Sequence, residues 1–106
     1  MASSTIHNPM AWKLAGTGSS CNIPQEIHEM LLVASYTDGS LRNWTYTMHI
    51  PSAEIAAGKR YWTGLYANAG AAYTGWNCNG SQMSFVGMWV DNNNVTAGTV
   101  VSYYYR

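Results

Sequence analysis

Two histidines and one carboxylate have the spacing in this sequence that best suits metal chemistry. Glu26 and His28 lie two positions apart, and His49 lies in a segment that is expected to pair with theirs as a hairpin. Two imidazoles and a carboxylate can hold a transition metal with one coordination position open. The alternative is that both histidines face solvent. We expect no metal and no other cofactor, with His28 and His49 as the candidate ligands should a metal be bound.

The groups needed for other kinds of catalysis are not arranged for a reaction. Of the five carboxylates, Asp38 and Asp91 occupy turn positions, where an aspartate stabilises the local backbone. No two carboxylates are placed across a cleft, as glycoside hydrolysis requires. The sequence also lacks a nucleophile elbow, a phosphate-binding loop and a dinucleotide fingerprint. We therefore expect a protein that is not an enzyme.

Aromatic and amide side chains gather between positions 66 and 79. Aromatic rings can stack on the faces of sugars, and amides can hydrogen-bond to their hydroxyl groups. This segment is therefore the candidate glycan-binding region. The alternative is an ordinary turn region whose aromatic residues belong to the core. The candidate ligand-binding residues are Tyr66, Tyr73, Trp76, Asn77 and Asn79.

The two cysteines, Cys21 and Cys78, form neither a disulfide framework nor a zinc motif. The first residues contain neither the basic stretch nor the apolar run of a signal peptide. We expect the chain to be made in a cytoplasm with both thiols free. The alternative is a single bridge between them.

The charge content of the chain is low. Charged residues make up 9% of the sequence and the net charge is zero, against about 25% charged residues in an average soluble protein. The scattered basic residues do not form the cluster that a nucleic-acid backbone requires. No stretch approaches the roughly 18 apolar residues of a membrane helix. We expect no nucleic-acid partner and no membrane insertion, and the weakly charged surface favours an oligomer.

The elements that must position these residues are short strands separated by turn signals, which predicts an all-β fold. We expect a single antiparallel β-sandwich or jelly roll of seven or eight strands over residues 10–106, preceded by an arm or linker over residues 1–9. The expected strands cover residues 10–16, 26–37, 41–50, 60–66, 73–76, 82–90 and 99–106.

The clearest local prediction is a hairpin around Asp38 and Gly39, a strong turn dipeptide. A loop of two or four residues would place Ile27, Leu31 and Val33 on one face with the apolar residues of 41–50. The polar face would then hold both histidines. A three-residue loop would break this assignment. The residues expected on the core face are Ile27, Leu31, Val33, Trp44, Tyr46, Met48 and Ile50.

The segment from Gln82 to Val90 has apolar residues at both odd and even positions. Such a strand lies in the middle of a sheet or meets a partner chain. Together with the tyrosine-rich C-terminus, it is the candidate region for contacts between subunits of an oligomer. The candidate subunit-interface residues are Met83, Phe85, Trp89, Tyr103 and Tyr105.

Five short segments occur in an order and spacing that covers most of the chain: Trp12–Gly16, Ile23–Pro24, Glu29–Val33, Ile50–Pro51 and Tyr103–Arg106. Together they resemble the C-terminal domains of phage and prophage virion proteins, of the tail-fibre or head-fibre kind.

The resemblance implies a β-sandwich on a trimeric or other symmetric assembly, located in the virion and made in the cytoplasm of a host bacterium, and we therefore expect a homotrimer. It also implies a partner, either a host surface glycan for attachment or another virion protein that the domain decorates. It supplies no catalytic residues. The alternative function is a protein-binding or assembly module, such as a capsid or tail accessory protein or an inhibitor of a host protein, with no sugar ligand.

Overall fold

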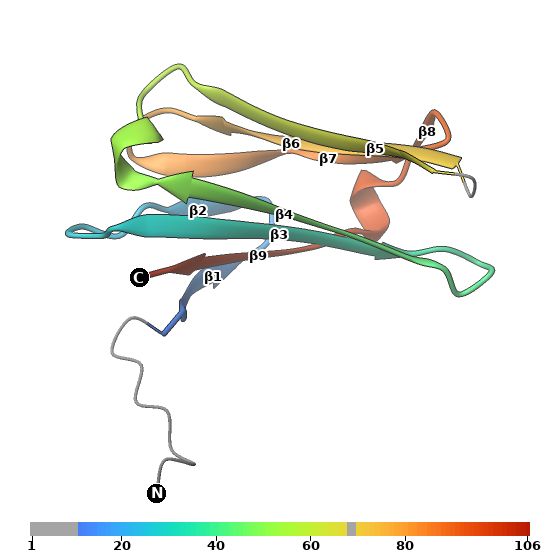
Figure 1. Cartoon of the computed structure of the whole chain (residues 1–106), viewed down its shortest axis with the longest axis horizontal. Coiled ribbons are helices and arrows are strands. Elements are labelled where there is room, and N and C mark those ends of the chain that lie inside the picture. The colour runs from blue at the N-terminus through green and yellow to red at the C-terminus, as the bar shows by residue number, and fades with distance from the viewer. Residues whose placement is uncertain (1–10, 68–69) are drawn as a thin grey trace, which may run out of the picture.

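The computed structural model describes residues 11–67 and 70–106, apart from the side chains of residues 65–67 and 70. Within this part of the chain there are nine strands, two short 3-10 turns and no α-helix. The strands form two antiparallel sheets that pack face to face (Figure 1). The predicted β-sandwich is therefore confirmed. The predicted arm, residues 1–9, lies outside the described residues.

One sheet has four strands. In order across the sheet they are β1 (Lys13–Thr17), β9 (Val100–Tyr105), β3 (Glu29–Thr37) and β4 (Asn43–Pro51).

The other sheet has five strands. In order across the sheet they are β2 (Ser20–Asn22), β7 (Gln82–Val90), β6 (Gly70–Cys78) and β5 (Arg60–Ala67), and the short β8 (Asn93–Asn94) pairs with β7.

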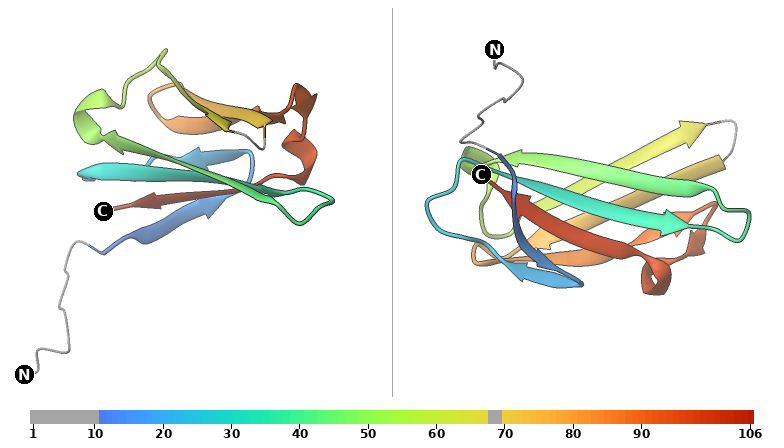
Figure 2. Two further views of the ribbon diagram at one scale, coloured as in Figure 1. Left: turned by 45° about the vertical axis from the view of Figure 1, so that its right-hand side comes forward. Right: turned by 90° about the horizontal axis from the view of Figure 1, so that it is seen from below.

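The chain passes between the sheets at places where its backbone can turn sharply (Figure 2). Gly18 joins β1 to β2 with a φ of 98°, a conformation that glycine adopts without steric cost. A 3-10 turn, η1 (Ser52–Glu54), leads from β4 to β5, and a second, η2 (Thr96–Gly98), leads from β8 to β9. The Tyr103 hydroxyl donates a hydrogen bond to the Gly18 carbonyl oxygen at 2.9 Å, which ties the first crossing to β9.

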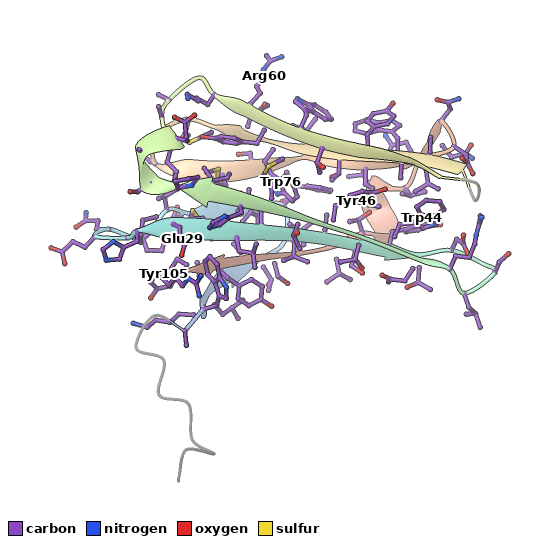
Figure 3. The ribbon with its side chains drawn as sticks, in the orientation of Figure 1. Glu29, Trp44, Tyr46, Arg60, Trp76 and Tyr105 are labelled. Atoms are coloured by element: carbon purple, nitrogen blue, oxygen red, sulfur yellow. The ribbon has the colours of Figure 1, made fainter. Side chains whose placement is uncertain are left out.

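The core lies between the inner faces of the two sheets. Trp44, Tyr46 and Trp76 all lie in the space between the sheets (Figure 3). The only buried polar residue of the described part, Thr74, donates its hydroxyl to the Gly87 carbonyl at 2.8 Å, so that its burial is compensated. The largest fully buried side chains are Trp76, Tyr103, Met30, Leu32, Ile50, Met83, Met88 and Thr74.

The structure corrects the predicted faces of the β3–β4 hairpin. Thr37 pairs with Asn43, so the loop between them has an odd number of residues, 38–42. A change of one residue in register exchanges the faces of one strand. Met30, Leu32 and Ala34 therefore point into the core with the even-numbered residues of β4, and the predicted placement of Leu31 and Val33 on the core face is wrong.

The strand β7 lies inside its sheet, between β2 and β6, which confirms one of the two predicted placements. A bulge also contributes to its two-sided apolar pattern. Trp76 pairs with Phe85 and Gly75 with Gly87, which leaves Val86 as an extra residue in a β-bulge. The bulge changes which positions face inward, from odd numbers before it to even numbers after it. The inward residues Met83, Phe85, Met88 and Val90 thus face one core.

Candidate functional site

Three aromatic rings lie together on the outer face of the five-stranded sheet, and we call them the aromatic platform. They are Trp62 of β5, Tyr73 of β6 and Trp89 of β7. The rings of Tyr73 and Trp89 are stacked, with centroids 5.2 Å apart and planes 10° apart. The Trp62 ring lies 6.2 Å from that of Trp89 and 6.4 Å from that of Tyr73. Trp62 is 46% exposed and Tyr73 41% exposed, so the platform faces solvent.

The strand register brings these rings together. Tyr73 lies directly opposite Trp89, and Trp62 lies opposite Gly75 on the next strand. Because side chains alternate along a strand, all three point away from the core. The residues beside Tyr73 and Trp89 along their strands, such as Ala72, Thr74 and Met88, point inward and are buried.

Two glycines leave space for the tryptophan rings to pack against the outer face of the sheet. A Cβ atom on Gly75 would come within 2.4 Å of Trp62 Cδ2, and one on Gly87 within 2.8 Å of Trp89 Cη2. The Trp62 ring therefore occupies the space where a Gly75 side chain would stand. One face of this ring packs against the backbone. The exposed surface of Trp62 is on the remainder of the side chain.

A polar border adjoins the platform. Arg60 and Asn77 are paired opposite each other at one end of β5 and β6, and Asn77 in turn pairs with Ser84 of β7. All three carry side chains on the same outer face as Trp62, by alternation. An exposed ring beside guanidinium, amide and hydroxyl groups can stack on a flat, weakly apolar ligand surface and hydrogen-bond to polar groups at its edge.

The four predicted glycan-binding residues whose side chains are described divide into three groups. Tyr73 and Asn77 lie on the exposed outer face, and Tyr73 belongs to the platform. Trp76 is fully buried and packs on Phe85, with ring centroids 5.5 Å apart, so its prediction as a ligand-binding residue is wrong. Asn79 holds a turn, because its Oδ1 atom accepts hydrogen bonds from the amides of Ser81 and Gln82.

The backbone of Tyr66 belongs to β5, and its side chain lies outside the described residues. The error at Trp76 has a simple cause. The strand β6 begins at Gly70 and continues without interruption to Cys78, so that Tyr73 and Trp76 fall on opposite faces.

The predicted subunit-interface residues are also separated by the structure. Met83 and Tyr103 are fully buried between the sheets, so they are not available at the surface and their prediction is wrong. Phe85 and Tyr105 are half-buried and pack against the core, and Trp89 belongs to the aromatic platform.

The candidate metal ligands do not come together. His28 precedes β3 and is exposed, whereas His49 of β4 lies opposite Leu31 on the outer face of the four-stranded sheet. The carboxylate that contacts His49 is Glu29 rather than the expected Glu26. Among the described residues, no group of three or more His, Cys, Asp or Glu side chains is placed to hold a metal ion.

Glu29 belongs to a second cluster, in which the charged groups are already paired. Its Oε2 atom accepts a hydrogen bond from Arg106 Nε at 2.5 Å, and its other oxygen contacts His49. The Arg106 guanidinium also lies 4.1 Å from the centroid of the Trp12 ring. The hydrogen bonds from Arg106 and then His49 hold the pKa of Glu29 below its ordinary value. This cluster fastens the C-terminus to β3 and β4 and offers no open group for a ligand.

The sequence prediction missed Trp62 and Arg60 as site residues and assigned Trp89 to a subunit contact. A signal for the platform was present in the glycines within β6 and β7, since glycine inside a strand marks a close approach of other atoms.

Comparisons with protein-family models, with curated proteins and with solved structures found no match to this chain. The resemblance to virion domains therefore stays a prediction. In the described part of the chain, no helix has the length and apolar character needed to cross a membrane.

Proposed function

We propose that this protein is a non-catalytic glycan-binding β-sandwich whose ligand lies on the aromatic platform. The observation that carries the proposal is the grouping of Trp62, Tyr73 and Trp89 on the outside of a sheet, where Trp62 and Tyr73 are exposed and Trp89 is half-buried. Large aromatic side chains rarely gather at the surface of a soluble domain unless the surface has a partner. From the sequence resemblance, we propose that the glycan belongs to a bacterial host surface and that the protein is a virion component.

A sugar ring suits this surface for physical reasons. One face of a pyranose presents C–H groups, which pack by dispersion against an aromatic ring and are attracted by its negative face. The hydroxyl groups at the edge of the sugar can then hydrogen-bond to Asn77 and Ser84 of the polar border. The open face of the sheet would leave room for neighbouring sugars of a longer chain.

The test is a glycan microarray followed by calorimetric titration of the best ligand. The wild-type protein is compared with Trp62→Ala, Trp89→Ala and the control Leu14→Ala, which removes an exposed apolar side chain from the other sheet. We expect each tryptophan variant to weaken binding about tenfold or more, and the Leu14 variant to bind as the wild type does. Circular dichroism establishes that each variant is folded.

Two outcomes would argue against this function. One is the absence of binding to any glycan on the array by the folded wild-type protein. The other is binding that both tryptophan variants retain at full strength, which would place the glycan elsewhere. Capture of a protein partner by the platform would favour the alternative, a protein-binding or assembly module.

A further inference from the structure

The five-stranded sheet has a single charged residue. None of the strands β2, β5, β6, β7 and β8 contains aspartate, glutamate or lysine, and their one arginine is Arg60, the first residue of β5. The outer face of this sheet therefore has a cation at one end and no carboxylate among its strand residues. The strand residues at that end carry one positive charge and no negative charge, which favours an anionic ligand.

Arg60 stands beside the platform. It lies two residues before Trp62 on the same face of β5, about 6.7 Å away along the strand. Its side chain projects outward from the sheet, whereas Trp76 of the neighbouring strand points inward (Figure 3). A small open pocket lies at this end of the sheet, lined by Gly58, Lys59, Arg60, Asn77 and Cys78.

The neighbouring cation, Lys59, is already paired, because its Nζ atom lies 3.2 Å from Glu54 Oε1. Within the described residues, Arg60 has no carboxylate partner. A guanidinium group presents parallel N–H donors that match the oxygens of a carboxylate or a sulfate. The opposite residue, Asn77, adds an amide donor from the next strand.

We propose that the glycan bound by this protein is acidic, with one sugar stacked on Trp62 and the anionic group of an adjacent position held by Arg60 and Asn77. This inference rests on the proposed glycan-binding function and specifies its ligand class. The carboxylate of a uronic acid and a sulfate ester share the required chemistry. The same geometry fixes the orientation of the ligand, because its anionic end must lie beside the first residue of β5.

The experiment compares three oligosaccharide probes by calorimetric titration at low and physiological salt. The first is an oligogalacturonate, the second is its fully methyl-esterified form, in which the same sugar chain has no charge, and the third is a sulfated galactan oligosaccharide. Each is titrated into the wild-type protein, Arg60→Gln, Arg60→Lys and the control Lys13→Gln, which removes a cation from β1 of the other sheet. Trp62→Ala is included to locate the sugar.

We expect at least one of the anionic probes to bind more tightly than the ester, and added salt to weaken that binding. Arg60→Gln should weaken binding of that probe about tenfold and leave the ester unaffected. The affinity of Arg60→Lys should fall between those of the wild type and Arg60→Gln, because lysine keeps the charge and loses the paired donors. Lys13→Gln should have no effect. Comparison of the affinities for the two anionic probes shows whether the protein binds a carboxylate or a sulfate.

The possible failures are distinguishable. If the ester binds as tightly as both anionic probes, or if Arg60→Gln binds an anionic probe as the wild type does, the acidic-glycan inference is wrong. In that case a loss of binding in Trp62→Ala would still support the platform. If none of the three probes binds, the inference is wrong for both anionic groups, and the microarray decides separately whether the platform binds a neutral glycan.

Discussion

At Gly75 the missing side chain decides where the ring of Trp62 lies. A methyl group there would meet Trp62 Cδ2 at 2.4 Å and Cε3 at 2.5 Å, well inside contact distance. The ring would have to leave the sheet surface, since the backbone of a central strand cannot move far. Gly75 therefore shapes the candidate site without contacting the ligand.

We predict that Gly75→Ala lowers the free energy of unfolding by about 1–3 kcal/mol, as overpacking does elsewhere, and weakens glycan binding. The matched control is Gly39→Ala, where no atom lies within 4 Å of the added Cβ, and a change within about 0.5 kcal/mol is expected. Urea unfolding and calorimetric titration measure the two effects. A Gly75→Ala protein with unchanged stability and binding would mean that the Trp62 ring is not held as described.

The buried hydroxyl of Tyr46 is a second residue with a measurable consequence. Within the described residues its oxygen has no hydrogen-bond partner, although it is shielded from solvent. A buried polar group without a partner costs about 1–3 kcal/mol. Tyr46→Phe is therefore expected to leave the free energy of unfolding unchanged or to raise it, and a clear loss of stability on urea unfolding would show that the hydroxyl is satisfied.

Two single residues also show how much of the candidate site could be predicted from the sequence. Tyr73 was predicted as a ligand-binding residue from its amide-rich surroundings, and the structure places it in the platform. Trp76, three positions later, was predicted with it and is buried. Both residues lie in the strand predicted over residues 73–76, and alternation puts positions three apart on opposite faces. The sequence does not show which of these two faces meets the core.

At the scale of elements, the loop between β3 and β4 explains the wrong hairpin faces. The Asp38 carboxylate accepts hydrogen bonds from the amides of Ser40 and Arg42, and from the Arg42 side chain at 2.7 Å. Leu41 adopts a φ of 62°, which completes the turn. The dipeptide Asp38-Gly39 indicated a turn correctly. Its five-residue length depends on the side-chain bonds to Asp38, which spacing alone does not predict.

This loop predicts an acid-sensitive step in stability. Burial raises the pKa of Asp38, but the hydrogen bonds from Arg42, Trp44 and Ser40 outweigh it and lower the value from 3.8 to about 2. The unfolded chain thus binds this proton first as the pH falls. The stabilisation is fully present above pH 3.8 and is lost as the pH falls toward 2.

We expect Asp38→Asn to unfold more easily than the wild type at pH 6, and this difference to shrink as the pH is lowered through that window. Thermal unfolding at a series of pH values measures it. The control is Glu26→Gln, which removes the same charge at an exposed position. A difference between Asp38→Asn and wild type that is independent of pH would contradict the assigned role of this carboxylate.

The bulge at Val86 in β7 is another feature that could not be predicted from the sequence. Its bounds were predicted correctly as residues 82–90, and its apolar residues were recognised. A bulge has no strong sequence signature, and the alternation on each side of it looks like a strand with two buried faces. Met83 was therefore predicted to contact another subunit, although it lies in the core.

At the scale of the whole molecule, the closed sandwich makes a prediction about its thiols. Cys21 of β2 and Cys78 of β6 are buried and pair with Met83 from opposite sides. Two strand spacings separate them by about 9.5 Å, too far for a disulfide. Burial also raises the pKa of the Cys21 thiol.

We therefore expect neither thiol to react rapidly with Ellman's reagent in the native protein, and both to react once the protein is unfolded in urea without reductant. Rapid reaction in the native state would show that the sandwich is open at this end. Absence of free thiol after unfolding would indicate a disulfide and contradict the strand order.

The homotrimer remains a prediction from the sequence, now without Met83 and Tyr103 as contacts. Light scattering measures it directly. A mass about three times 11.7 kDa would support it, and a mass of one chain would contradict it.

The most direct test of the aromatic platform uses the indole N–H signals of the five tryptophans in a two-dimensional NMR spectrum. The glycan that binds most tightly on the microarray is titrated into the ¹⁵N-labelled protein. We predict that the signals of Trp62 and Trp89 move most, whereas those of the buried Trp44 and Trp76 and of Trp12, on the other sheet, move little. Movement concentrated at Trp12, with Trp62 and Trp89 unchanged, would contradict the account.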